Sequence, residues 1–277
     1  MKLRKKILVP QIVLNIIIIL LLVIMLYPLA MSLWNAFKSQ VGYDYTRWYP
    51  TLPLRINNLK VAYEETWRYT LNTVIVAIVG TLGCLAIASL SAYTFARMEF
   101  PGRKLLFVLV IGLMMIPGVL TLVPSYSIYR SMGLLNNLLV LILPVIIGGS
   151  IFGVFLLHSF FQGLPNAVFE SARIDGAGDF QCYLKIALPL CRPILGTLTI
   201  MKFVDVWNDY LWPMITIHDY DKLTISAGLL VSFTKQYTSN MPVTFAGYLI
   251  ASTPLIFLFI FANQFYIDGL VNSAIKM

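Results

Sequence analysis

Six long apolar runs divide the chain, and each is long enough to cross a membrane as a helix. The runs cover approximately residues 7–30, 71–95, 105–124, 138–161, 194–217 and 244–266. A helix rises about 1.5 Å per residue, so about 20 apolar residues cross a hydrocarbon core about 30 Å thick. The first run follows a basic cluster, but it is longer than the core of a signal peptide, so we expect it to remain as an anchor. The pattern predicts an all-α, polytopic membrane protein with six transmembrane helices.

Composition excludes several other classes of protein. Hydrophobic residues make up 59% of the 277 residues and charged residues only 12%, whereas soluble domains carry about a quarter charged residues. Three Cys cannot form a disulfide framework for a chain of this length. The net charge of +8 would suggest a nucleic-acid partner in a soluble protein, but here the basic residues lie in short segments between apolar runs. We therefore expect a lipid membrane and no nucleic acid as a partner.

The distribution of Lys and Arg predicts the orientation in the membrane. The basic residues are more frequent in the N-terminal segment and in alternate loops after it, once the long first outer loop is set aside. Both termini are therefore expected in the cytoplasm. The predicted organisation is a cytoplasmic N-terminus at 1–6, a first span at 7–30, an extracytoplasmic loop at 31–70, a core of five spans at 71–267 that contains a cytoplasmic loop at 162–193, and a cytoplasmic tail at 268–277.

Small residues recur at every fourth position of the second apolar run. They are Gly80, Cys84, Ala88, Ala92 and Ala96, and the fourth run carries Gly149 and Gly153. Small residues allow the close backbone approach that replaces the hydrophobic drive between helices in lipid. We interpret both patterns as helix packing without a further role.

The cytoplasmic loop at 162–193 has signals for two short helices. Pro165 suits a first helical turn and Gly176 suits a left-handed cap, while Asp179 suits the N-cap of the second helix. One apolar stripe follows at helical spacing, formed by Phe180, Tyr183, Leu184 and Ala187. The stripe either packs on the ends of neighbouring spans or forms an exposed surface for a partner.

The same loop resembles a known family. The segment from Glu170 to Ala177, followed by Ile186, Leu188, Pro189 and Pro193, resembles the EAA loop of ATP-binding-cassette (ABC) importer permeases, and Ser171 is its one departure. The resemblance extends along most of the chain to the smaller permease of maltose-type carbohydrate importers. It includes the segments 97–103, 207–213 and 264–270.

The resemblance implies a fold, partners and functional residues. The fold would be that of a type I ABC importer permease in the plasma membrane of a bacterium or archaeon. A second permease, implied to be a different chain, would complete a pathway for an oligosaccharide or related sugar. Two ATPase subunits would bind ATP and Mg, and an extracytoplasmic protein would deliver the sugar. The residues implied to contact an ATPase subunit are Glu170, Ser171, Ala172, Asp175, Gly176 and Ala177.

Charged residues within the fifth apolar run suggest a substrate pathway. Lys202 and Asp205 are three residues apart and can pair, and Pro213 frees the backbone carbonyl of Asp209. Carboxylates and amides beside aromatic rings suit the hydroxyl edge and apolar face of a sugar. The candidate pathway residues are Asn72, Asp205, Trp207, Asn208, Asp209 and Tyr210. The alternative is that the ion pair only joins helices and the aromatic residues belong to the interfacial belt.

No enzyme or cofactor chemistry is expected of this chain. No Gly is followed by Lys, so a G-x-x-x-x-G-K phosphate loop is absent and ATP must bind another subunit. The two His and three Cys lack metal-ligand spacing, and no catalytic pair is recognisable. A proton-coupled secondary transporter is the alternative function, because a membrane Asp can relay protons. That alternative leaves the EAA-like segment without a role.

Overall fold

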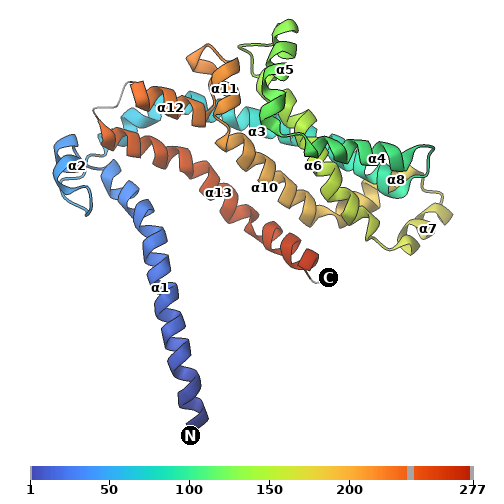
Figure 1. Cartoon of the computed structure of the whole chain (residues 1–277), viewed down its shortest axis with the longest axis horizontal. Coiled ribbons are helices and arrows are strands. Elements are labelled where there is room, and N and C mark those ends of the chain that lie inside the picture. Colours follow the sequence, from blue (N-terminus) through green and yellow to red (C-terminus); the bar gives the residue numbers. More distant parts are fainter. Residues whose placement is uncertain (1, 236–239, 275–277) are drawn as a thin grey trace. The chain divides into compact units, whose positions relative to one another are not determined.

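A computed structural model describes residues 2–235 and 240–274, with side chains at 11–233 and 240–260. Every element in the described backbone is helical, as Figure 1 shows. The chain forms two compact units, Met1–Trp67 with Leu229–Thr253 and Arg68–Gly228 with Pro254–Met277. The predicted segments at 1–6 and 268–277 lie partly outside the described residues, at residue 1 and at 275–277.

Among the described residues, four helices are long and apolar enough to cross a membrane. They are α1 (Lys2–Ala36), α3 (Asn57–Arg97), α6 (Leu139–Gln162) and α13 (Met241–Ala274). Two bent helix pairs raise the total to six when each pair is one span. The structure therefore agrees with the predicted all-α polytopic fold.

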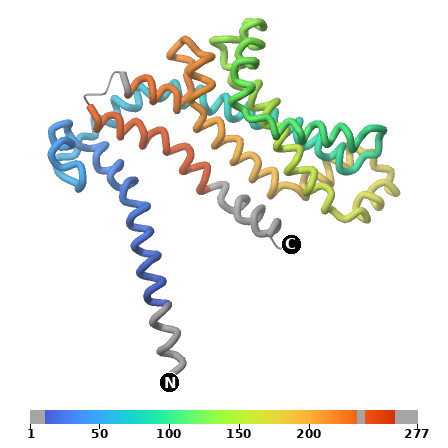
Figure 2. Tube along the Cα trace, in the orientation of Figure 1, coloured from blue at the N-terminus to red at the C-terminus, as the bar shows by residue number. Residues whose placement is uncertain are grey.

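The third predicted span is a bent pair and not one straight helix. Helix α4 (Arg103–Gly112) continues into η1 (Leu113–Met115), and α5 (Gly118–Ser131) then leaves at 99°. Ile116 between them is extended, as expected for a residue before proline, and Pro117 has no backbone N–H to continue the helix. The change of direction is plain in the green part of the trace in Figure 2.

The fifth predicted span is also interrupted. Helix α10 (Arg192–Asn208) ends before an extended Asp209, and α11 (Leu211–Thr216) follows. Because Pro213 has no N–H, the Asp209 carbonyl is free of a helical bond, and the Thr224 hydroxyl donates to it at 3.4 Å. The break confirms the effect predicted for Pro213.

Helices occupy much of the segment predicted as the loop at 31–70. Helix α1 continues to Ala36, α2 covers Gln40–Thr46, and α3 begins at Asn57, well before its apolar run. Hydropathy marks only the part of a helix that lies in lipid. The polar first turns of α3 include the good helix formers Leu59, Lys60, Ala62, Glu64 and Glu65, and the helix starts earlier than the apolar pattern indicates.

The first unit holds a buried lysine after α1. Lys38 is 2% exposed, and its Nζ donates to the backbone carbonyls of Thr46 and, at 2.6 Å, of Tyr49. Burial lowers the pKa of Lys38. In the same unit, the Tyr43 ring contacts Phe245 of α13. The two Lys38 hydrogen bonds hold the carbonyls of Thr46, at the end of α2, and of Tyr49 against the segment that follows α1.

In the second unit, α3 packs on α6 through small residues in register. A Cβ built on Gly80 would lie 2.9 Å from the Val145 side chain, one on Gly149 would lie 3.1 Å from Cys84 Sγ, and one on Gly153 would lie 2.6 Å from Ala88 Cβ. From one contact to the next, the paired positions lie four residues further along both helices. This register confirms the packing role predicted for the small-residue stripe.

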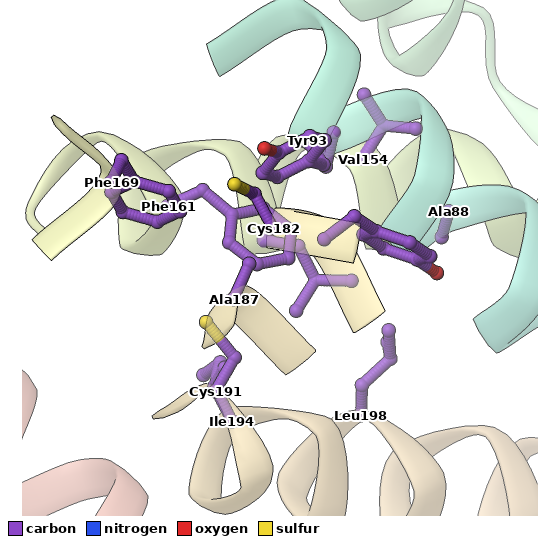
Figure 3. Close-up of a cluster of buried hydrophobic side chains, with 13 residues drawn as sticks. Ala88, Tyr93, Val154, Phe161, Phe169, Cys182, Ala187, Cys191, Ile194 and Leu198 are labelled. Carbon is purple, nitrogen blue, oxygen red and sulfur yellow. The ribbon is translucent and has the colours of Figure 1, made fainter. Parts of the chain in front are cut away.

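A buried cluster joins this pair of helices to the loop at 162–193, which was predicted to be cytoplasmic and is built from α7 (Asn166–Ile174), α8 (Asp179–Cys182), η2 (Tyr183–Ala187) and α9 (Leu188–Leu190). Figure 3 shows Ala88 and Tyr93 of α3, Phe161 of α6 and Phe169 of α7 in this cluster, with Leu198 of α10 below them. All five are at most 4% exposed. The loop therefore has a core in common with the spans of its own unit.

Two helices have not yet been named. They are η3 (Tyr220–Lys222) in the second unit and α12 (Ile225–Lys235), which begins in the second unit and ends in the first.

Candidate functional site

Helix α7 has defined ends, because the sequence supplies a proline before it and a glycine after it. Pro165 directly precedes Asn166, the first helical residue. Gly176 has φ +83°, and the turn closes through hydrogen bonds from the Gly176 N–H to the Arg173 carbonyl at 3.0 Å and from the Ala177 N–H to the Ala172 carbonyl at 2.9 Å. This is the Schellman arrangement, which requires a left-handed residue. The structure confirms the left-handed cap predicted at Gly176.

The second loop helix begins one residue earlier than a cap at Asp179 would allow. Gly178 is the N-cap, and Asp179 is the first helical residue. Its carboxylate instead accepts a hydrogen bond from Arg173 at 2.9 Å. That hydrogen bond raises the pKa of Arg173, and it ties the end of α7 to the start of α8.

The predicted apolar stripe of the second helix does not face one way. Tyr183 and Ala187 are buried in the core cluster, whereas Phe180 is 63% exposed and Leu184 is 45% exposed. Residues Tyr183–Ala187 form a π-helical turn, which widens the spacing and rotates the stripe. Tyr183 and Ala187 therefore agree with the packing interpretation, whereas Phe180 and Leu184 form an exposed apolar pair, for which a partner stays a prediction.

The six residues implied to contact an ATPase subunit also divide into two groups. Ala172 and Ala177 are half-buried and pack against the core cluster. The exposed members are Glu170, Ser171, Asp175 and Gly176. Ile174, which the sequence analysis did not single out, is 86% exposed and lies among them.

A cavity of about 330 Å³ lies between α3, α6 and α10. Its charged lining is Lys202, Asp205 and Asp209, and Val76 and Thr224 complete other walls. Lys202 Nζ lies 2.7 Å from Asp205 Oδ2, which confirms that these two residues pair. The Lys202 side chain is 14% exposed and that of Asp205 is 63% exposed, so the carboxylate is the accessible member.

A second cavity, of about 370 Å³, shares Pro144 and Asp209 with the first. Its aromatic lining is Tyr129 and Trp212, whose ring centroids are 5.8 Å apart in an edge-to-face arrangement. Its polar lining also includes Thr121 and Ser125. The Trp212 indole donates to the Val140 carbonyl at 2.8 Å, which fixes the ring. Sequence reasoning missed the α5 residues of this cavity, since they lie far away in the sequence, in the third apolar run or just after it.

Four of the predicted pathway residues do not line either cavity. Trp207 is 3% exposed and stacks on Phe203, and the Asn208 amide donates to a carbonyl of its own helix at 3.0 Å. Asn72 donates to the carbonyls of Asp221 and Leu223 at 2.8 and 3.0 Å. Tyr210 is 51% exposed. Of the predicted set, Asp205 and Asp209 are the cavity residues.

Within the described part of the chain, no group of three or more His, Cys, Asp or Glu residues could hold a metal ion. The three cysteines are all buried thiols.

Comparison with known proteins gives the family. Residues 84–269 match the family described as binding-protein-dependent transport system inner membrane component. The arabinooligosaccharides transport system permease protein AraQ of Halalkalibacterium halodurans is 30% identical over 226 residues, 80% of each chain. The diacetylchitobiose uptake system permease protein NgcG of Streptomyces coelicolor is 31% identical over 245 residues, 87% of this chain and 81% of the relative.

A solved structure has a similar fold. It is a bacterial ABC transporter involved in the import of the acidic polysaccharide alginate, with a TM-score of 0.81 and 20% identity over 92% of this chain and 95% of that one. Together, the family match over two thirds of the chain, the relatives and the fold show that this multi-pass membrane protein belongs to the family of permease components of binding-protein-dependent ABC importers.

Proposed function

We propose that this chain forms, with a second permease, the transmembrane pathway for an oligosaccharide or related sugar. In this proposal, an extracytoplasmic binding protein delivers the sugar and both termini of the chain lie in the cytoplasm. The cytoplasmic loop at 162–193 seats one of two ATPase subunits, which bind ATP and Mg. The chain itself is not an enzyme.

The substrate class is supported by the relatives and by the cavity at α5, α6 and α11. AraQ is named for arabinooligosaccharides and NgcG for diacetylchitobiose, and both are carbohydrates. In the cavity, the Tyr129 and Trp212 rings offer apolar faces, and the Asp209 carboxylate and the hydroxyl of Thr121 offer hydrogen-bonding groups. A sugar presents the matching surfaces, an apolar ring face and a hydroxyl edge.

The seat for the ATPase subunit is supported chiefly by the exposure of Ile174. This side chain is 86% exposed at the end of a helix that is capped at Gly176 and fixed on the core cluster through Phe169. A large aliphatic side chain held rigidly in water is unfavourable unless a partner covers it. Glu170 and Asp175 beside it supply acidic groups that a basic partner surface could bind.

The proton-coupled alternative has no support from the comparisons. The matching family is that of binding-protein-dependent systems, and the EAA-like segment has a role only in the ABC importer.

The test is to replace Ile174 by Glu in the assembled transporter and to purify the complex through a tag on this chain. We expect Ile174→Glu to lose the ATPase subunits, because a buried unpaired carboxylate would be desolvated at the interface. Ile56, which is 70% exposed in the first outer loop, provides the matched control, and Ile56→Glu should retain them. Retention of the ATPase subunits by Ile174→Glu, or uptake in proteoliposomes that continues on a proton gradient without ATP, would refute the proposal.

A further inference from the structure

The last turns of α3 carry three polar residues on one helical face. Ser89, Tyr93 and Arg97 are spaced by four residues, and positions four apart lie above one another on a helix. Each of the three contacts the cytoplasmic loop or its junction with α6. We call these residues the α3 clasp.

Arg97 makes the most extensive contacts of the clasp. Its Nε and one terminal nitrogen donate to the Phe161 carbonyl at 2.9 and 2.5 Å, and that terminal nitrogen also donates to the Leu164 carbonyl at 2.5 Å. The other terminal nitrogen donates to Asn166 Oδ1, the first residue of α7, at 2.5 Å. The guanidinium carbon lies 4.5 Å from the centroid of the Phe169 ring.

The chemistry of these acceptors explains why an arginine is suited to this position. The Phe161 carbonyl lies at the C-terminal end of α6, where carbonyls lack helical partners and the helix dipole favours a cation. A planar guanidinium presents five N–H donors in a fixed fork, so it can bond several acceptors in its plane while its face stacks on an aromatic ring, whereas the three donors of an ammonium radiate from one atom. One side chain of α3 therefore holds the end of α6 and the start of α7 together.

Tyr93 and Ser89 extend the clasp to the second loop helix. The Tyr93 ring centroid lies 5.8 Å from that of Phe161, 6.4 Å from that of Phe169 and 5.4 Å from that of Tyr183. The Ser89 hydroxyl lies 2.7 Å from the Tyr183 hydroxyl. Tyr93 is 2% exposed and belongs to the buried cluster drawn in Figure 3.

Helix α3 also reaches the cavity that contains the ion pair. Val76 lines this cavity, and the helix is continuous from there to Arg97. At about 1.5 Å per residue, the two positions are about 30 Å apart along one helix. Close-packed interiors transmit displacement because they have few voids to absorb it.

We propose that the α3 clasp passes a displacement of the cytoplasmic loop into α3 and so to the wall of the cavity, with Arg97 as the positioning residue that sets the angle of α7. The inference rests on the proposed function, in that the loop must seat the ATPase subunit. The loop is covalently continuous only with α6, which precedes it, and α10, which follows it. The clasp adds α3 to the helices that move with it.

The test compares Arg97→Met and Arg97→Lys with Arg103→Met in the complete transporter in proteoliposomes. Arg103, in the same inner loop, donates from its guanidinium to the Met98 carbonyl at 2.9 Å, and it serves as a charge-matched control. Two quantities are measured in each complex: sugar taken up per ATP hydrolysed, and the ATPase subunits retained on purification. We expect Arg97→Met to keep its ATPase subunits and to lower the uptake per ATP about tenfold, the effect of one charge-assisted hydrogen bond. Arg97→Lys should recover part of the loss, and Arg103→Met should equal the wild type.

The outcomes separate this inference from the proposed function. An unchanged uptake per ATP in Arg97→Met, in a complex with its full complement of ATPase subunits, overturns the clasp and leaves the proposed function in place. If Arg97→Met does not assemble, Arg97→Lys and Ser89→Ala decide: a lowered ratio in both supports the clasp, and a wild-type ratio in either overturns it. Retention of ATPase subunits by Ile174→Glu refutes the proposed function itself, whatever Arg97 does.

Discussion

The ammonium of Lys202 lies 2.7 Å from the carboxylate of Asp205, one turn along α10, and the two side chains differ in exposure, at 14% and 63%. The buried member is Lys202, and the accessible member lines the cavity. A polar pair of this kind contributes about 0.5–1 kcal/mol, because solvent screens the exposed partner. The asymmetry leaves the Asp205 carboxylate accessible to a molecule in the cavity.

A single and a double variant at this pair separate pairing from a role in the pathway. If the Asp205 carboxylate contacts the passing sugar, as the proposed function implies, Asp205→Asn should lower sugar uptake, and uptake by the double variant Lys202→Met with Asp205→Asn should be equally low. Uptake is measured in proteoliposomes at equal amounts of assembled complex. Restored uptake in the double variant would mean that the pair only joins the helix to its surroundings.

The second cavity predicts an aromatic contribution to uptake. Trp212→Ala should lower the uptake rate about tenfold at saturating binding protein, because the ring face that stacks on a sugar is lost. Trp212→Phe keeps a ring and should recover most of the rate. Tyr210→Ala, outside both cavities, is the matched control and should transport normally. Equal rates in Trp212→Ala and Tyr210→Ala would argue against this cavity as part of the pathway.

The contact of α6 with α3 makes a prediction about stability. A Cβ on Gly153 would lie 2.6 Å from Ala88 Cβ and 3.1 Å from Leu198, so Gly153→Ala should destabilise the protein by about 1–3 kcal/mol through overpacking. Gly148 lies on the same helix and has no atom within 4 Å of the Cβ position, so Gly148→Ala should leave the stability unchanged. Thermal unfolding of the purified complex in detergent checks both. A melting temperature of Gly153→Ala as high as that of Gly148→Ala would show that α3 and α6 are not this close.

Gly176 and Gly178 differ in backbone conformation and not in available space. Neither has an atom within 4 Å of the Cβ position, but Gly176 has φ +83° and Gly178 has φ −74°. Gly176→Ala should therefore destabilise the turn after α7 by about 1–2 kcal/mol, while Gly178→Ala should not. Faster trypsin cleavage after Arg173 in Gly176→Ala alone is the expected readout. Equal cleavage in the two variants would mean that the left-handed turn is not required.

Local chemistry made several features predictable from the sequence. The turn at Gly176, the pairing of Lys202 with Asp205 and the break caused by Pro213 each depend on residues within a few positions of one another. The close approach of another helix to the small-residue face of α3 followed from the spacing of these residues, because close approach in lipid depends on their size, whereas the partner α6 and the register came from the structure. The family resemblance in the cytoplasmic loop was also readable, since its motif is contiguous.

Features that depend on packing between distant segments were not predictable. Asn72 and Trp207 have the right chemistry for a pathway, but long-range contacts place one against the carbonyls of Asp221 and Leu223 and bury the other. The second cavity joins Tyr129, which lies after the third apolar run, to Trp212 in the fifth. The exposure of Ile174 depends on which face of α7 packs on the core cluster, and a helix of nine residues is too short for periodicity to show that.

The claim that the cytoplasmic loop seats a separate ATPase subunit is tested most directly by site-specific photo-cross-linking in intact membranes. A benzophenone amino acid is placed at Ile174, which is 86% exposed, and in a second variant at Phe169, which is 4% exposed. We predict a cross-linked product between this chain and the ATPase subunit from position 174 and none from position 169. Cross-links from position 174 that stay within this chain or reach only lipid, in a transporter that still imports sugar, would contradict the account.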